Sequence, residues 1–136
     1  MSEPDILDAL TQYLALDAGV TALIGERIYP DVLPTNVQLP AARMIEVDQD
    51  TPGRTLEGPT LLRRARIQFD IYGPERDALV GISNALINAL AGKSFTLSGC
   101  RVRGVTVENV FGEMDASNEL RRRVVDFGVP YAVEVV

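Results

Sequence analysis

Two acidic pairs with one intervening residue are the first feature of this sequence that could do chemistry. Asp48 with Asp50, and Glu113 with Asp115, would suit general acid and base catalysis if each pair shared a pocket. The same spacing occurs in calcium-binding loops, but neither pair is followed by both the glycine and the final glutamate of such a loop. Both pairs lie in polar stretches where charge is ordinarily solvated. We therefore interpret them as surface charges and not as catalytic or metal-binding groups.

Histidine is absent from the sequence, and Cys100 is its single cysteine. The lack of histidine excludes Ser-His-Asp, Cys-His and His-metal sites. One thiol forms neither an internal disulfide nor a four-thiolate metal site, so we interpret Cys100 as a small buried apolar residue. No GxxxxGK[ST] loop is present, and Gly99 to Gly104 lacks the strand-to-helix context of a dinucleotide site. We expect no enzyme activity and no cofactor.

Arginine and acidic residues are unevenly distributed along the chain. Arg121, Arg122 and Arg123 form the one basic run, but side chains alternate on a strand, so Arg122 should face away from the other two. The net charge of −6 disfavours specific binding of nucleic acid. The first 60 residues hold ten acids and three bases, and the rest hold nine acids and ten bases. This asymmetry either supplies surfaces for subunit contacts or is a chance distribution over solvated faces.

Length and composition are those of one small folded domain spanning residues 1–136. The chain is 46% apolar and 24% charged, which is ordinary for a globular protein. No apolar run is long enough to cross a bilayer, and the first ten residues are acidic, unlike a secretory signal. We expect a protein that stays in the cytosol unless it is packaged into a larger particle.

Hydrophobic spacing in the first half predicts one helix and one strand. Apolar residues recur at helical spacing over about 3–16, and a short apolar turn then ends at Gly25. Three prolines make 30–40 an irregular connection, and 41–47 can form a strand. The stretch 48–60 (DQDTPGRTLEGPT) has almost nothing to bury, so it is expected to form a long mobile loop.

The second half contains the clearest pattern of the sequence. Residues 64–71 alternate strictly between apolar and polar side chains, which predicts an antiparallel strand with one wet face. Pro74 begins a helix over about 75–91, whose apolar stripe must lie on the sheet.

Three more strands are expected after this helix. Residues 95–97 and 101–111 should form a hairpin joined at Ser98 and Gly99, with a bulge at Gly104. A polar loop over 112–119 precedes a final strand, in which Pro130 predicts a position at an edge or near the strand's end. We therefore predict an α+β fold, a mainly antiparallel sheet with two helices on one face, in the order α-β-β-α-β-β-β.

Five short motifs in a fixed order make the chain resemble a known family. They are ALIGERIYP at 22–30, LP at 39–40, TLEGP at 55–59, ARIQFDIYG at 65–73 and RRRVVDFGVPY at 121–131. Their order resembles the tail-completion family of tailed phages, over about residues 20–135. The resemblance implies a tail terminator, or tail-to-head joining protein, located at the head-tail junction of a virion assembled in the bacterial cytoplasm.

The same resemblance implies partners and a mode of action. A homo-hexameric ring would cap the tail tube and dock on the head-tail connector or stopper protein, with no enzyme activity and no membrane. DNA would pass through without specific binding, because an acidic wall repels phosphate. Two alternatives remain open: another virion component, such as a tail-tube or head-side adaptor subunit, and a small non-phage ligand-binding domain.

The polar loops and arginine-bearing strands supply the candidate interface. A closed ring needs two different complementary patches on each copy. We predict that the residues at the subunit or tail interface are Asp48, Asp50, Arg54, Glu57, Arg64, Arg66, Glu113, Asp115, Arg121 and Arg123.

Overall fold

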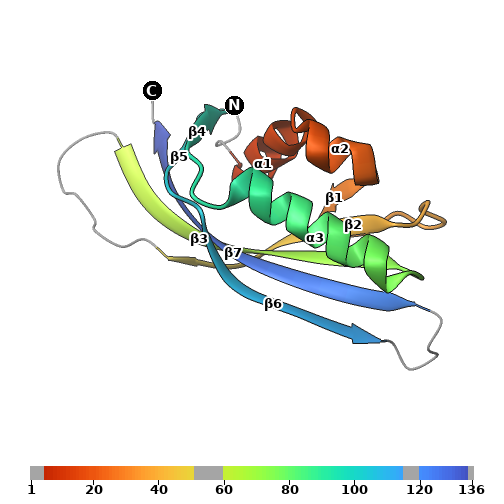
Figure 1. Cartoon of the computed structure of the whole chain (residues 1–136). Helices are drawn as coiled ribbons and strands as arrows, with labels where there is room; N and C mark the ends of the chain where they lie inside the picture. Colours follow the sequence, from red (N-terminus) through yellow and green to blue (C-terminus); the bar gives the residue numbers. More distant parts are fainter. Residues whose placement is uncertain (1–4, 51–59, 115–119, 135–136) are drawn as a thin grey trace.

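The structure, a computed structural model, describes residues 5–50, 60–114 and 120–134, with the backbone alone at 50, 60–62, 113–114 and 134. In this part of the chain, three helices cover one face of a seven-stranded sheet (Figure 1). The strand order is β1-β2-β3-β7-β5-β4, with β6 also paired to β7. The predicted α+β fold is confirmed, with a third helix and the order α-α-β-β-β-α-β-β-β-β.

Two short helices begin the described chain. Helix α1 (Ile6–Ala15) starts at Asp5, whose Oδ1 accepts a hydrogen bond of 2.9 Å from the backbone N–H of Leu7. Helix α2 (Ala18–Ile24) starts at Asp17, whose Oδ1 accepts from the N–H of Val20 at 2.9 Å. The segment predicted as a single apolar turn is therefore a capped helix, which adds the third helix to the fold.

Strands β1 (Ile28–Pro30) and β2 (Ala41–Asp50) form the parallel pair of the sheet. Ile28 and Tyr29 were assigned to no predicted element, and Pro30 to the irregular connection over 30–40, because three residues are too few to show a readable alternation. Strand β2 continues to Asp50, with a register shift between Glu46 and Asp48. The prediction that a loop begins at Asp48 is therefore wrong, because pairing with the neighbouring strand outweighs the polar composition.

Strands β3 (Thr60–Gly73) and β7 (Arg121–Glu134) are the antiparallel centre of the sheet. Their side chains alternate as predicted, and the apolar set points toward the helices. Phe69 and Phe127 meet edge to face there, with ring centroids 5.5 Å apart. This pair of strands forms the floor of the hydrophobic core.

Helix α3 (Arg76–Leu90) packs on the sheet and buries one side of its surface, as the sequence predicts (Figure 1). Its buried residues include Leu79, Ile82 and Leu86. At its end, the hydroxyl of Tyr13 donates to the carbonyl of Ala89 at 2.8 Å. The Tyr13 ring also stacks on Phe95, with centroids 3.9 Å apart, so α1 is held to both α3 and the sheet edge.

Strands β4 (Phe95–Leu97), β5 (Cys100–Val102) and β6 (Thr106–Met114) complete the sheet. Ser98 and Gly99 both have positive φ and form the predicted turn between β4 and β5. Gly104, with φ +62°, divides the predicted single strand 101–111 into β5 and β6, so it marks a break and not a bulge.

Of the two positions that the sequence allowed for Pro130, an edge strand or a place near the strand's end, the edge is wrong: Pro130 lies in a central strand, four residues before its end at Glu134. Strand β7 pairs with β3 on one side, and with β6 up to Gly128 and β5 from Tyr131 on the other. The carbonyl of Pro130 accepts from the N–H of Arg103 at 3.0 Å. The proline nitrogen points to the same side, in the interval between the two partner strands, so its missing N–H leaves β3 pairing intact.

No helix in the described residues is long and apolar enough to span a lipid bilayer.

Candidate assembly interface on the open sheet face

The sheet face opposite the helices, here called the open face, carries charged side chains along three neighbouring strands. Successive side chains of a strand point to opposite faces of the sheet. The residues of β2, β3 and β7 that alternate with the buried ones must therefore point away from the helices. The charged residues concerned, with one from β6, are Arg43, Asp48, Arg64, Arg66, Asp70, Glu108, Arg122 and Asp126.

Asp70 lies at the centre of this face and is fully buried. Arg43 donates to its Oδ2 from Nη2 at 2.7 Å and from Nε at 3.1 Å. Arg122 Nη2 donates to Oδ1 at 3.2 Å, and Gln68 Nε2 donates to the same atom at 2.8 Å. The face predicted to be wet is therefore closed over Asp70, because two guanidinium groups take the place of water.

Asp126, which neighbours Asp70 on the open face, is 1% exposed. Arg66 Nη2 donates to its Oδ2 at 3.0 Å, while Oδ1 is buried with no hydrogen-bond partner among the described residues. An unsatisfied buried oxygen costs about 1–3 kcal/mol. The Arg66 contact is therefore the main compensation for burying this carboxylate.

Glu108 lies over Gly128 and is the third carboxylate of this face that pairs with an arginine, with Arg64 Nη2 3.1 Å from its Oε1. The hydroxyl of Thr106 donates to the same oxygen at 2.8 Å. These hydrogen bonds, Thr106 first and Arg64 second, lower the pKa of Glu108. Any side chain at residue 128 would collide with Glu108 and Thr106, so glycine is what lets the pair lie flat on the strand.

A groove of about 540 Å³ crosses the open face between β2, β3 and β6. Its charged lining consists of Asp48, Arg64, Arg66 and Glu108. The side chains of Arg64 and Arg66 are about half exposed, whereas the carboxylate of Asp126 lies buried beneath Arg66. A shallow, charged groove of this kind fits a polar protein surface better than a small apolar ligand.

The chain matches the family model described as "Tail completion protein gp17" over residues 8–131. This chain belongs to that family. It is therefore a tail-completion protein, a structural component of a phage-type tail and virion. A chain of the virion of a native gene transfer agent (GTA) particle is similar in fold, with a TM-score of 0.71, 17% identity and 92% of both chains covered. No curated protein matches the sequence.

Three predicted interface residues of the tail-completion protein come together in the groove: Asp48, Arg64 and Arg66. Asp50 pairs in register with Arg64, and Glu113 with Arg122, although their side chains are not described. Arg54, Glu57 and Asp115 lie outside the described residues.

Arg121 and Arg123 lie at the start of β7, away from Gly128, which lines the groove. Arg123 is on the helix side, where its Nε donates to Ser83 Oγ of α3 at 2.9 Å. Arg122 projects to the open face, as the alternation predicts. The arginine run therefore ties β7 to structures on both sides of the sheet.

Sequence reasoning did not identify the residues that hold the open face together, which are Arg43, Asp70, Arg122 and Asp126. Asp70 was recognised only as a member of the polar half of its strand. The signal that could have found them is that polar positions of three strands lie opposite one another, with arginine on one strand and aspartate on the next. That signal needs the strand register, which one sequence alone does not provide.

Proposed function

We propose that this tail-completion protein forms a six-fold ring that caps the tail tube and joins it to the head connector, acting by assembly and not by catalysis. The observation that carries the proposal is the family match over nearly the whole chain. The charged open face supports it, because that face offers a protein partner many hydrogen-bond donors in a fixed arrangement.

We assign the open face to the contact with the tail tube or head connector. Each exposed guanidinium has five donors, and the internal partners of Arg64 and Arg66 use only part of them. Carboxylate or carbonyl groups on a partner can occupy the rest. Asp48, also exposed, adds an acceptor at the rim of the same groove.

DNA passing through the ring is expected to meet little free positive charge on the open face. Arg64 is neutralised by Glu108, and Arg66 by Asp126, within the same chain. The net charge of −6 also disfavours phosphate binding. The proposal therefore includes passage of DNA without specific binding.

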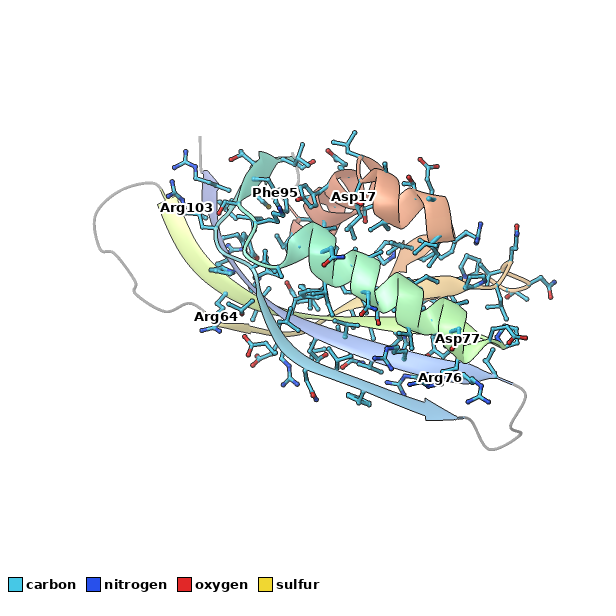
Figure 2. All side chains as sticks on the ribbon, viewed as in Figure 1. Asp17, Arg64, Arg76, Asp77, Phe95 and Arg103 are labelled. Carbon is cyan, nitrogen blue, oxygen red and sulfur yellow. The ribbon has the colours of Figure 1, made fainter. Side chains whose placement is uncertain are left out.

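The direct experiment mixes purified protein with tail tubes that lack a completed end, and scores the tube ends by electron microscopy. Wild type should add a cap to one end. Arg64→Glu should reduce capping at least tenfold, because it reverses an exposed charge on the open face. Arg76→Glu is the matched control, since Arg76 lies on α3 on the helix side (Figure 2).

Two results would contradict the proposal. If Arg64→Glu and wild type cap tube ends equally well, the open face does not contact the tail tube. Binding of wild type along the tube wall or at the capsid, and not at tube ends, would favour a tail-tube or head-side adaptor subunit.

A further inference from the structure

Two outer edges of the sheet differ in charge and in what they expose. Strands β1 and β2 begin the strand order, and β5 and β4 end it, so these pairs form opposite edges. We define the acidic edge as Asp31, Val32, Glu46, Val47 and Asp48, all exposed. We define the basic edge as Lys93, Arg101 and Arg103, also exposed, beside β4 and β5.

The acidic edge has an open backbone and exposed apolar side chains. Strand β1 pairs with β2 only over Ala42–Met44, so from Ile45 onward β2 borders β3 alone among the described residues. Val32 and Val47 are 72% and 48% exposed beside this bare stretch. An unpaired strand edge with apolar residues is a surface that another chain can cover.

Like charges on the acidic edge are poorly compensated within the chain. Burial is the first cause that raises the pKa of Glu46, and the charges of Asp5 and Asp31 raise it further, against an opposing effect of Arg63. Neither Asp31 nor Asp48 forms an ion pair with a described residue. A cation brought to this edge would relieve the repulsion.

Lys93 and Arg103 of the basic edge are held by their backbone, while their side chains are exposed. The N–H of Lys93 donates to the carbonyl of Leu90 at 3.0 Å, and the N–H of Arg103 to Pro130 at 3.0 Å. Their side chains form no ion pair with a described residue. Figure 2 shows Arg103 at the β4–β5 end of the molecule, pointing outward.

We propose that the basic edge of one copy docks on the acidic edge of the next copy, with Val32 and Val47 covered at the centre of the contact. This inference rests on the proposed ring. A second copy is the fitting occupant, because the same chain carries both complementary surfaces on opposite edges. Such a contact is heterologous and repeats by rotation until the ring closes, whereas a two-fold contact of either edge would bring like charges together.

Lys93 makes the contact directly testable, because it is the only lysine in the sequence. A carbodiimide reagent joins a lysine amine to a nearby carboxylate as an amide. Equal parts of ¹⁴N- and ¹⁵N-labelled protein, mixed and incubated with tail tubes, should give mixed-isotope peptides that link Lys93 to Asp31, Glu46 or Asp48. The Lys93→Arg variant keeps the charge and should cap tubes but lose the cross-link.

Charge reversal adds an independent readout of assembly. Lys93→Glu with Arg103→Glu, or Asp31→Lys with Glu46→Lys, should each reduce ring formation at least tenfold. The variant carrying all four changes should recover most of the ring formation, because the two edges again carry opposite charges, with their signs exchanged. The four positions are exposed, and thermal melting of each variant verifies that it folds.

The outcomes separate this inference from the proposed function. If wild type caps tube ends without a mixed-isotope cross-link, or the fourfold variant fails to recover, the edge contact is wrong and the capping role stands. If the cross-links form but tube ends are not bound, the edge contact stands and the capping role fails.

Discussion

Arg43 donates two hydrogen bonds to one carboxylate oxygen of Asp70, a residue that is fully buried on the sheet face with no helix over it. Arg122 and Gln68 occupy the other oxygen. The open face thus contains a small polar core of its own, built from three adjacent strands. Its residues are expected to matter for folding as well as for assembly.

Asp70→Ala is expected to lower the free energy of unfolding by about 2–4 kcal/mol. The change leaves two guanidinium groups without their shared acceptor, although both are partly exposed and can be solvated. Urea unfolding measures the difference. Asp77→Ala is the matched control, because the Asp77 side chain is fully exposed and should not change the midpoint. Equal midpoints for the two variants would contradict the structural role of Asp70.

Phe69→Ala is expected to cost about 3–5 kcal/mol, because it opens a cavity against Phe127 in the centre of the core. Phe69→Asp should prevent folding, since it buries an unpaired charge. Thermal melts followed by circular dichroism test both. Glu57→Lys, in the stretch that the sequence predicts to be a polar loop, should melt like wild type. If Glu57→Lys destabilised the protein as much as the Phe69 variants do, the division into core and surface residues would be mistaken.

The stability of the protein should fall as the pH rises above about 9. Burial raises the pKa of the Cys100 thiol from 9.0 to about 11, so the unfolded chain releases this proton first. At about 1.4 kcal/mol per pKa unit, the free energy of unfolding should drop by roughly 2 kcal/mol between pH 9 and 11. Burial also raises the pKa of Tyr13 and Tyr131, which adds to the loss above pH 10.

Urea titrations across this range provide the measurement for the thiol. The Cys100→Ala variant should be less dependent on pH between 9 and 11, because the titrating group is gone. If the free energy of unfolding of Cys100→Ala depended on pH as strongly as that of wild type, Cys100 would not contribute to the loss of stability. Alkylation offers a second check, since the native thiol at pH 8 should react far more slowly than the unfolded one.

Gly128→Ala should displace Glu108 from Arg64 with little effect on folding. The added methyl group would meet the ends of the Glu108 and Thr106 side chains, which can move aside. The pKa of Glu108 should then rise toward its ordinary value, as measured by NMR titration of the carboxylate. Gly112→Ala is a matched control with only ordinary contacts, and it should leave this pKa unchanged. A Glu108 pKa that stays low in Gly128→Ala would contradict the role of the glycine.

Much of the fold was predictable because its main elements carry strong periodic signals. The alternation in β3 and the apolar stripe of α3 identify a strand and a helix without tertiary information. The elements that sequence reasoning missed or shortened are strands that depend on pairing with a neighbouring strand. Strand β1 exists because β2 lies beside it, and β2 reaches Asp50 because β3 offers a partner.

The candidate interface was predictable only in part, for a related reason. Arg64 and Arg66 are visible as polar positions of a clear strand, and the structure brings them into one groove with Asp48. The burial of Asp70 and Asp126 was not visible, because aspartate on an alternating strand ordinarily indicates a solvated side. Only the register of β2, β3 and β7 shows that arginines from adjacent strands cover both carboxylates.

Strands β3 and β7 run side by side without a register shift, from Thr60 opposite Glu134 to Gly73 opposite Arg121. A pull that slides one strand along the other loads every cross-strand bond of this ladder together, so they must rupture as a group. A peel from one end would instead break them one after another. Mechanical resistance in this protein is therefore greatest along the long axis of its two central strands.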